Sequence, residues 1–344
     1  MQDRAAVAEA MSPVGSIRSP GLPGSAGYSR FLLGEQMSEE HADWTVSDTV
    51  GLSAVVNCSA RAVESDRPDG LINDPLAARF VHAVRIPTTL PTQVDELRGS
   101  GAAGAMVASR FGGIRARVMD DFLLAANAAG VEQAVIFSPG FDTRAYRLDW
   151  PSEMDFYEVE QPGLLDLKAK VLREAHAQPR CARHAVGVDP RRDEWEFSLR
   201  GAGFDATRPT AWVAEGILLY LSAQGEADLF TAVHKLSAPG SRLAMQYMPA
   251  ELIHWFAEHT ALTDTTATLG TDIGSVNWNT EPRQAAPARL KAAGWEVRLD
   301  SVMDRGLALG VSLYEEFSAV GDDAGIEFPV SDEPDGFLFG TLPR

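Results

Sequence analysis

Apolar residues are grouped differently before and after Gly130. After that glycine, short apolar runs alternate with longer stretches in which apolar residues recur at helical spacing. The runs predict seven strands, at 132–138, 154–160, 183–189, within 210–221, and at 241–248, 294–300 and 335–342. Strands that alternate with helices in this way are typical of βαβ units. The sequence therefore predicts an α/β fold with a mostly parallel, Rossmann-like sheet.

Residues 47–130 show helical patterns instead. A short helix is predicted around Val55 and Val63, and a second begins at Pro75, with Asp74 as its N-cap. Residues 87–103 are rich in Thr, Pro and Gly and predict a loop. A further helix, ending at Gly130, is predicted from apolar residues spaced four apart: Ile114, Val118, Phe122 and Ala126.

Two segments depart from these patterns. Residues 1–43 predict a mobile tail that is dispensable for folding, because twelve of the twenty residues at 11–30 are Ser, Pro or Gly. Residues 249–282 interrupt the strand–helix alternation with a helical stretch and a polar loop, and are interpreted as an inserted cap. The predicted organisation is a tail, a helical lid over 44–130, and a sheet domain over 131–344 that carries the cap.

Composition narrows the function classes. The chain has 30 Lys and Arg against 48 Asp and Glu, a net charge of −18, whereas nucleic-acid binding requires clustered basic residues. No apolar run approaches the ~20 residues of a membrane span, and no signal peptide pattern opens the chain. Two cysteines are too few for a disulfide framework or a four-thiolate zinc site. We expect a cytoplasmic protein that acts on a small molecule without a metal; the oligomeric state is not indicated.

Candidate ligand contacts follow the first two predicted strands. In an open parallel sheet, ligands bind beyond the carboxyl ends of the strands. Gly140 lies in the turn after the first strand, where it permits close approach of a ligand or simply a tight turn. Glu160 ends the second strand, 20 residues later, where an acid commonly accepts hydrogen bonds from ribose hydroxyls. The alternative for Glu160 is an exposed acid at a strand end.

Three charged residues elsewhere have two interpretations each. Glu215 lies within an apolar run, and a buried carboxylate is costly unless it is paired. It either forms a salt bridge to a core arginine or faces a cationic ligand in a pocket. Arg115 and Arg117, on the predicted helix, are either pocket cations or charges on the helix surface.

Five blocks together resemble a known family. They are SARAVESDRPDGLINDPLAARFV (59–81), RARVMDDFL (115–123), AVIFSPGFDTRAYRLDWP (134–151), FYEVEQP (156–162) and TAWVAEGILLYL (210–221). In this order they resemble the leucine carboxyl methyltransferase family, and within it the actinobacterial S-adenosylmethionine-dependent O-methyltransferases, which include the tetracenomycin-type polyketide carboxyl methyltransferases. The resemblance implies a class I methyltransferase fold, with a seven-stranded sheet and extra helices over the pocket, and S-adenosylmethionine as cofactor.

The resemblance also implies which residues contact the cofactor. They are Ser138, Gly140 and Asp142 in the turn, Glu160 at the ribose, Asp189 at the adenine amine, Glu215 in the pocket, Arg117 facing the cofactor carboxylate, and Arg61 in the lid. Three positions depart from the family pattern. The glycine-x-glycine turn reads Ser138-Pro139-Gly140, Glu160 stands where Asp is usual, and Pro190 removes a backbone donor beside Asp189.

The acceptor is expected to be a carboxylate on an apolar or polyketide-like molecule. A carboxylate is ionised at neutral pH and needs no base, whereas a phenol, with a pKa near ~10, benefits from one. The sequence has no His–Asp pair at a diagnostic spacing. The alternatives are a phenol O-methyltransferase and a non-catalytic protein of the same fold. A nicotinamide-dependent oxidoreductase would need G-x-G-x-x-G where this chain has SPGFDT.

Candidate acceptor contacts lie near the ends of the fourth and fifth strands and in the cap. Tyr220, Tyr247 and His254 are the candidate catalytic residues, with Gln246 beside Tyr247; packing roles are the alternative for each. The cap aromatic residues Trp255, Phe256 and Trp278 either line an apolar acceptor pocket or fill the core of the cap.

Overall fold

The computed structural model describes residues 49–84, 89–97, 102–191, 195–249, 253, 285–313, 315 and 336–344. The predicted tail and almost all of the predicted cap lie outside these residues. Within the described ranges, no helix combines the length and apolarity needed to cross a membrane.

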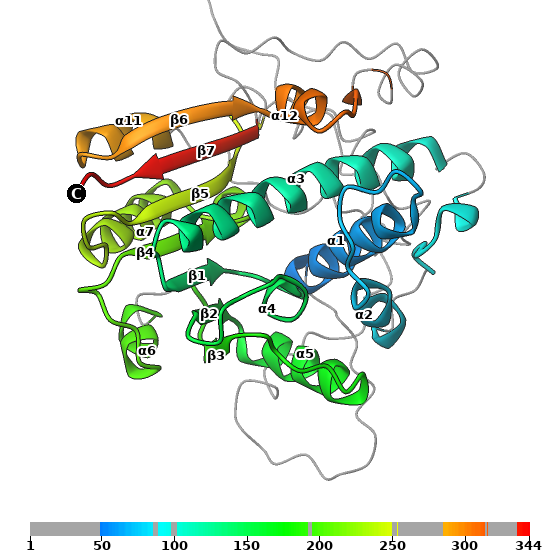
Figure 1. The fold of residues 1–344 in the computed structure, drawn as a ribbon, viewed down its shortest axis with the longest axis horizontal. Coiled ribbons are helices and arrows are strands. Elements are labelled where there is room, and N and C mark those ends of the chain that lie inside the picture. The colour runs from blue at the N-terminus through cyan, green and yellow to red at the C-terminus, as the bar shows by residue number, and fades with distance from the viewer. Residues whose placement is uncertain are drawn as a thin grey trace, which may run out of the picture. The chain divides into compact units, whose positions relative to one another are not determined.

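A seven-stranded sheet carries the fold, and all seven predicted strands are present (Figure 1). They are β1 Gln133–Phe137, β2 Asp155–Glu160, β3 Ala182–Gly187, β4 Thr210–Ala214, β5 Arg242–Tyr247, β6 Glu296–Ser301 and β7 Gly336–Thr341. The strand order is β3-β2-β1-β4-β5-β7-β6. Strands β1 to β5 pair in parallel, and β7 is antiparallel to both β5 and β6. The prediction of a mostly parallel α/β sheet is confirmed.

Helices cover both faces of the sheet, which explains why β1 and β4 are buried along their whole length. One face packs on α3 (Ala102–Ala128) and α12 (Val302–Ala308) through a cluster that includes Ile114 and Val302. The other face packs on α6 (Trp195–Gly201), α7 (Ala223–Lys235) and α11 (Ala286–Ala292). The spacing-of-four prediction for α3 is confirmed, since Ile114, Val118 and Ala126 are buried.

Three more helices lie near the carboxyl ends of the strands. Helix α1 (Thr49–Asp66) packs on α3 and on α2 (Ala77–Ala83), and α2 in turn packs on α5 (Pro162–Glu174). A buried cluster joins them, in which Phe80 of α2 stacks on Phe141 with ring centroids 4.8 Å apart. Figure 1 shows α1 between α3 and α2, near the end of β1.

Several predicted boundaries are wrong. The short helix is the 18-residue α1, and α2 begins at Ala77 with Leu76 at its N-cap. Asp74 lies two residues before that N-cap, where its Oδ1 accepts from the Leu76 N–H at 3.2 Å and its Oδ2 pairs with Arg61 at 2.9 Å. The predicted loop at 87–103 contains a 3₁₀-helix, η1 (Val94–Glu96), and the first residues of α3.

Candidate cofactor site

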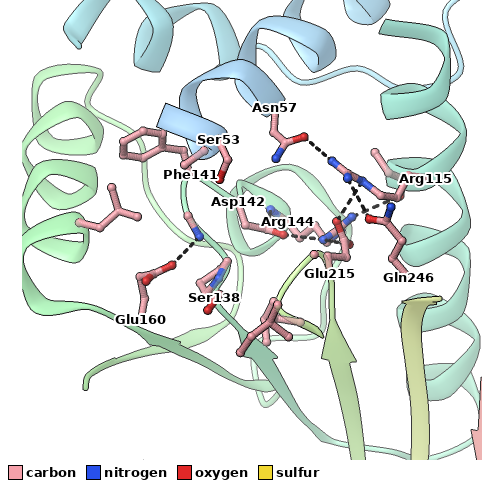
Figure 2. Close-up of a pocket in the computed structure, with 18 of the residues that line it drawn as sticks. Ser53, Asn57, Arg115, Ser138, Phe141, Asp142, Arg144, Glu160, Glu215 and Gln246 are labelled. Carbon is pink, nitrogen blue, oxygen red and sulfur yellow. Dashed lines mark hydrogen bonds and ion pairs between the residues drawn. The ribbon is translucent and has the colours of Figure 1, made fainter. Parts of the chain in front are cut away.

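A pocket lies beyond the carboxyl ends of β1, β2 and β4, beneath α1 (Figure 2). This is where an open parallel sheet binds its ligands. Side chains or backbone from many parts of the chain line it, including α1, α3, the turn after β1, the segments that follow β2, β3 and β4, and the end of β5. The expected residues Arg61, Ser138, Gly140, Asp142, Glu160, Asp189, Glu215 and Tyr220 all line this pocket.

The turn after β1 has an unusual backbone. Ser138 has φ 47° and Gly140 has φ 54°, both in the left-handed region that glycine tolerates best. A Cβ at Gly140 would lie 2.9 Å from the Cβ of Ala54 on α1. Gly140 is therefore required by both its conformation and the approach of α1. Ser138 adopts the conformation without being glycine, and its N–H donates to the carbonyl of Val159 at 2.9 Å.

Glu160 is buried at the end of β2 and points toward this turn. Its Oε2 accepts from the Gly140 N–H at 2.9 Å, and its Oε1 accepts from the Gln161 N–H at 2.8 Å. Burial raises the pKa of this carboxyl, although the two N–H donors oppose the shift. The exposed-acid alternative is thus excluded for Glu160. Each oxygen keeps a lone pair for a further donor.

Arg144, the first residue of α4 (Arg144–Arg147), joins two buried acids, Asp120 and Asp142, and the half-buried Glu215. Its guanidinium lies 2.7 Å from Asp120, 2.5 Å from Asp142 and 2.7 Å from Glu215. Burial, the largest single effect, raises the pKa of Asp142, but the charges of Arg144, Lys168 and Arg147 and the hydrogen bond from the Arg144 N–H together lower it to about 2. Glu215 therefore forms the salt bridge to a core arginine, and it also lines the pocket, where contact with a cationic ligand stays a prediction.

Arg115 of α3 enters the pocket and is held mainly by neutral groups (Figure 2). Its Nη2 donates to Oδ1 of Asn57 at 2.6 Å, and its Nη1 donates to Oε1 of Gln246 at 3.1 Å. Its Nε lies 3.7 Å from Oε2 of Glu215. Burial is the largest cause of the lowered pKa of this guanidinium.

Arg117 does not line the pocket, so its expected placement is wrong. Its side chain is 44% exposed and pairs with Asp121 at 2.9 Å, one turn further along α3. Two residues correspond to about 200° of rotation around a helix, so Arg115 and Arg117 point to nearly opposite sides. Only one of them can face the pocket, and it is Arg115.

Arg61 and Asp189 mark two further parts of the pocket. Arg61 Nη2 donates to the carbonyl of Phe141 at 2.8 Å, which fixes α1 to the turn after β1. Asp189, beyond β3, accepts from Arg191 at 2.7 and 2.8 Å. Both arginines line the pocket.

The candidate acceptor residues separate into three groups. Tyr220 lines the pocket from the 3₁₀-helix η2 (Leu218–Tyr220) rather than from β4, and burial raises its pKa. Tyr247 does not line the pocket. It is buried on the face of the sheet that packs on α6, α7 and α11. Strand alternation turns Gln246 toward the pocket instead. His254 and the cap aromatic residues lie outside the described part of the chain.

Sequence reasoning missed several pocket residues. Ser53, Asn57, Phe141 and Arg144 gave no signal as separate residues, because their positions depend on how α1 meets the turn after β1. Among the described residues, no three His, Cys, Asp or Glu side chains form a group that would hold a metal ion.

The chain matches one protein family and is similar to several named bacterial proteins. Residues 54–234, more than half of the chain, match the family described as leucine carboxyl methyltransferase. A Mycolicibacterium gilvum protein named "Putative S-adenosyl-L-methionine-dependent methyltransferase" is 38% identical over 82% of this chain and 95% of its own length. A similarly named protein of Streptomyces coelicolor is 37% identical over 75% of this chain and 86% of its own length. Another, of Mycobacteroides abscessus, is 44% identical over 62% of this chain and 68% of its own length.

Proposed function

Because this chain belongs to the leucine carboxyl methyltransferase family and its cofactor is S-adenosylmethionine, we propose that it methylates a carboxylate on an apolar, polyketide-like small molecule. The tetracenomycin-type carboxyl methyltransferases are the branch whose substrates are of this class. The alternative acceptor, a phenol, is one outcome of the experiment described below.

The pocket fits S-adenosylmethionine, which carries an adenine, a ribose diol, an amine and a carboxylate. The buried acid Glu160 would accept from the ribose hydroxyls, and Asp189 would lie at the adenine amine. Glu215 would face the cationic amine and Arg115 the carboxylate, in the role first expected of Arg117. The left-handed turn at Ser138 and Gly140 would allow the backbone to approach the cofactor closely.

The family match is the observation that supports a carboxylate acceptor, because the family is described as leucine carboxyl methyltransferase. Five arginines also line the pocket: Arg61, Arg115, Arg144, Arg147 and Arg191. A guanidinium is suited to hold a carboxylate through two parallel hydrogen bonds.

The residues of the chain would contribute orientation and exclusion of water. The cofactor supplies a methyl group that is made electrophilic by its bond to a sulfonium. Methyl transfer requires the acceptor oxygen, the methyl carbon and the sulfur to lie in line, and holding that geometry lowers the barrier. Helix α1 covers the turn after β1, where Ala54 contacts Gly140 and Arg61 donates to Phe141. An ionised carboxylate needs no base.

The test uses the full-length protein, cofactor with a labelled methyl group, and a small-molecule extract analysed by mass spectrometry. We expect a labelled product from which mild alkali releases methanol, as it does from a methyl ester. With that acceptor, kcat/KM should stay constant from about pH 7 to 9, because the carboxylate is already ionised. An alkali-stable product whose formation rises with pH would reject the carboxylate and favour the phenol.

A further inference from the structure

Two amide side chains hold Arg115 from elements that are far apart in the sequence. Asn57 belongs to α1, and Gln246 is on β5, more than one hundred residues beyond Arg115. Figure 2 shows both amides directed at the guanidinium, above Glu215. The position of this guanidinium is therefore fixed by the helix above the pocket and by the sheet below it.

Amide oxygens orient a guanidinium without neutralising it. The other pocket arginines have close carboxylate partners: Arg61 with Asp74, Arg144 with Asp142 and Glu215, Arg147 with Asp120, and Arg191 with Asp189. For Arg115, the closest carboxylate among the described residues belongs to Glu215, at 3.7 Å. The other oxygen of that carboxylate already pairs with Arg144 at 2.7 Å.

This arrangement leaves a buried positive charge that the described residues compensate only in part. The Arg115 side chain is 12% exposed. A buried charge without a close counter-ion destabilises a protein, so it favours binding of an anion at the same place. A guanidinium has five N–H donors, and the two amides take two of them. Donors remain that are able to bind a carboxylate.

We infer that Asn57 and Gln246 are positioning residues whose neutral amides keep the charge of Arg115 available to the carboxylate of the cofactor. The inference rests on the role proposed above for Arg115 and is independent of the acceptor. An aspartate or glutamate at either position would hold the guanidinium equally well but would compete with the ligand for its charge.

The experiment measures binding rather than turnover, by titration calorimetry. The two ligands are S-adenosylhomocysteine and S-adenosyl-3-thiopropylamine, which lacks only the carboxylate and keeps the amine. The ratio of their affinities reports on the carboxylate alone. For Asn57→Asp and for Gln246→Glu, we expect this ratio to fall by about tenfold or more, because the introduced charge pairs with Arg115. The melting temperature of the ligand-free protein should rise in both variants.

Gln161→Glu is the matched control. Gln161 lines the same pocket, but it follows β2, where its N–H donates to Glu160. The substitution introduces the same charge near the ribose end, which the two ligands share, so the ratio should change by less than about twofold. Arg115→Met separates the two proposals. If it leaves the ratio unchanged, the role of Arg115 itself is rejected. If it abolishes the preference while Asn57→Asp and Gln246→Glu keep it, the positioning role is overturned.

Discussion

The backbone N–H of Gly140 donates to Oε2 of Glu160 at 2.9 Å, so the turn after β1 is bonded directly to the end of β2. The two residues form one unit on the β2 side of the pocket. A change in either of them is therefore expected to alter both the turn and ligand binding.

Glu160→Ala should weaken binding of S-adenosylhomocysteine by about 1.5–3 kcal/mol, through loss of hydrogen bonds to a charged acceptor. Glu160→Gln is the matched control, because its carbonyl oxygen can still accept from one of the two N–H donors at 2.8 and 2.9 Å. It should lose less affinity than the alanine variant. Unchanged affinity in Glu160→Ala, measured by calorimetry, would reject the ribose assignment.

Gly140→Ala should destabilise the protein more than Gly130→Ala does. Both glycines have positive φ, 54° and 88°, so both alanines incur a backbone strain of roughly 1–2 kcal/mol. Only at Gly140 does the added Cβ meet another atom, the Cβ of Ala54 at 2.9 Å, whereas nothing lies within 4 Å at Gly130. Urea unfolding would measure the difference. Adding Ala54→Gly should recover part of the loss at Gly140 and none at Gly130.

Arg115→Met should weaken binding of S-adenosylhomocysteine by about tenfold or more, because the side chain is buried in the pocket. Arg117→Met should leave the affinity within about twofold. Arg117 forms a surface pair with Asp121 that contributes roughly 0.2–1 kcal/mol of stability. The unfolding free energy of the Arg117→Met variant should therefore change little. Equal effects of the two substitutions on binding would contradict the orientation of α3.

Asp142→Asn should lower stability most at neutral pH. The pKa of Asp142 is about 2 in the folded protein against an ordinary value of 3.8, so ionisation favours the folded state above the ordinary pKa. This contribution, roughly 2 kcal/mol, is fully present above about pH 5 and is lost as the pH falls toward about 2. Unfolding free energies of both proteins across this range would show the difference shrinking. A difference that is constant with pH would exclude the charge effect.

The strands were predictable because burial on both faces leaves continuous apolar runs in β1 and β4. The spacing between Gly140 and Glu160 likewise located two residues that the structure brings into contact. The first signal depends on strand periodicity, and the second on a spacing of 20 residues between the turn after β1 and the end of β2.

The orientation of single side chains was harder to predict from the sequence. Choosing between Arg115 and Arg117 requires the rotation of α3, which is set by packing on the sheet and on α1. Choosing between Gln246 and Tyr247 requires the face that each residue occupies on β5, and both faces of that strand are covered. The contacts of Arg144 with Asp120 and Glu215 join segments that only the folded chain brings together.

The position of β7 between β5 and β6 has a consequence for biosynthesis. Within the described part of the chain, β6 pairs only with β7, which follows it in the sequence. While the ribosome is still making β7, β6 has no neighbour and the free side of β5 is an open edge. The nascent chain thus exposes two sets of unpaired backbone groups until Gly336–Thr341 emerges.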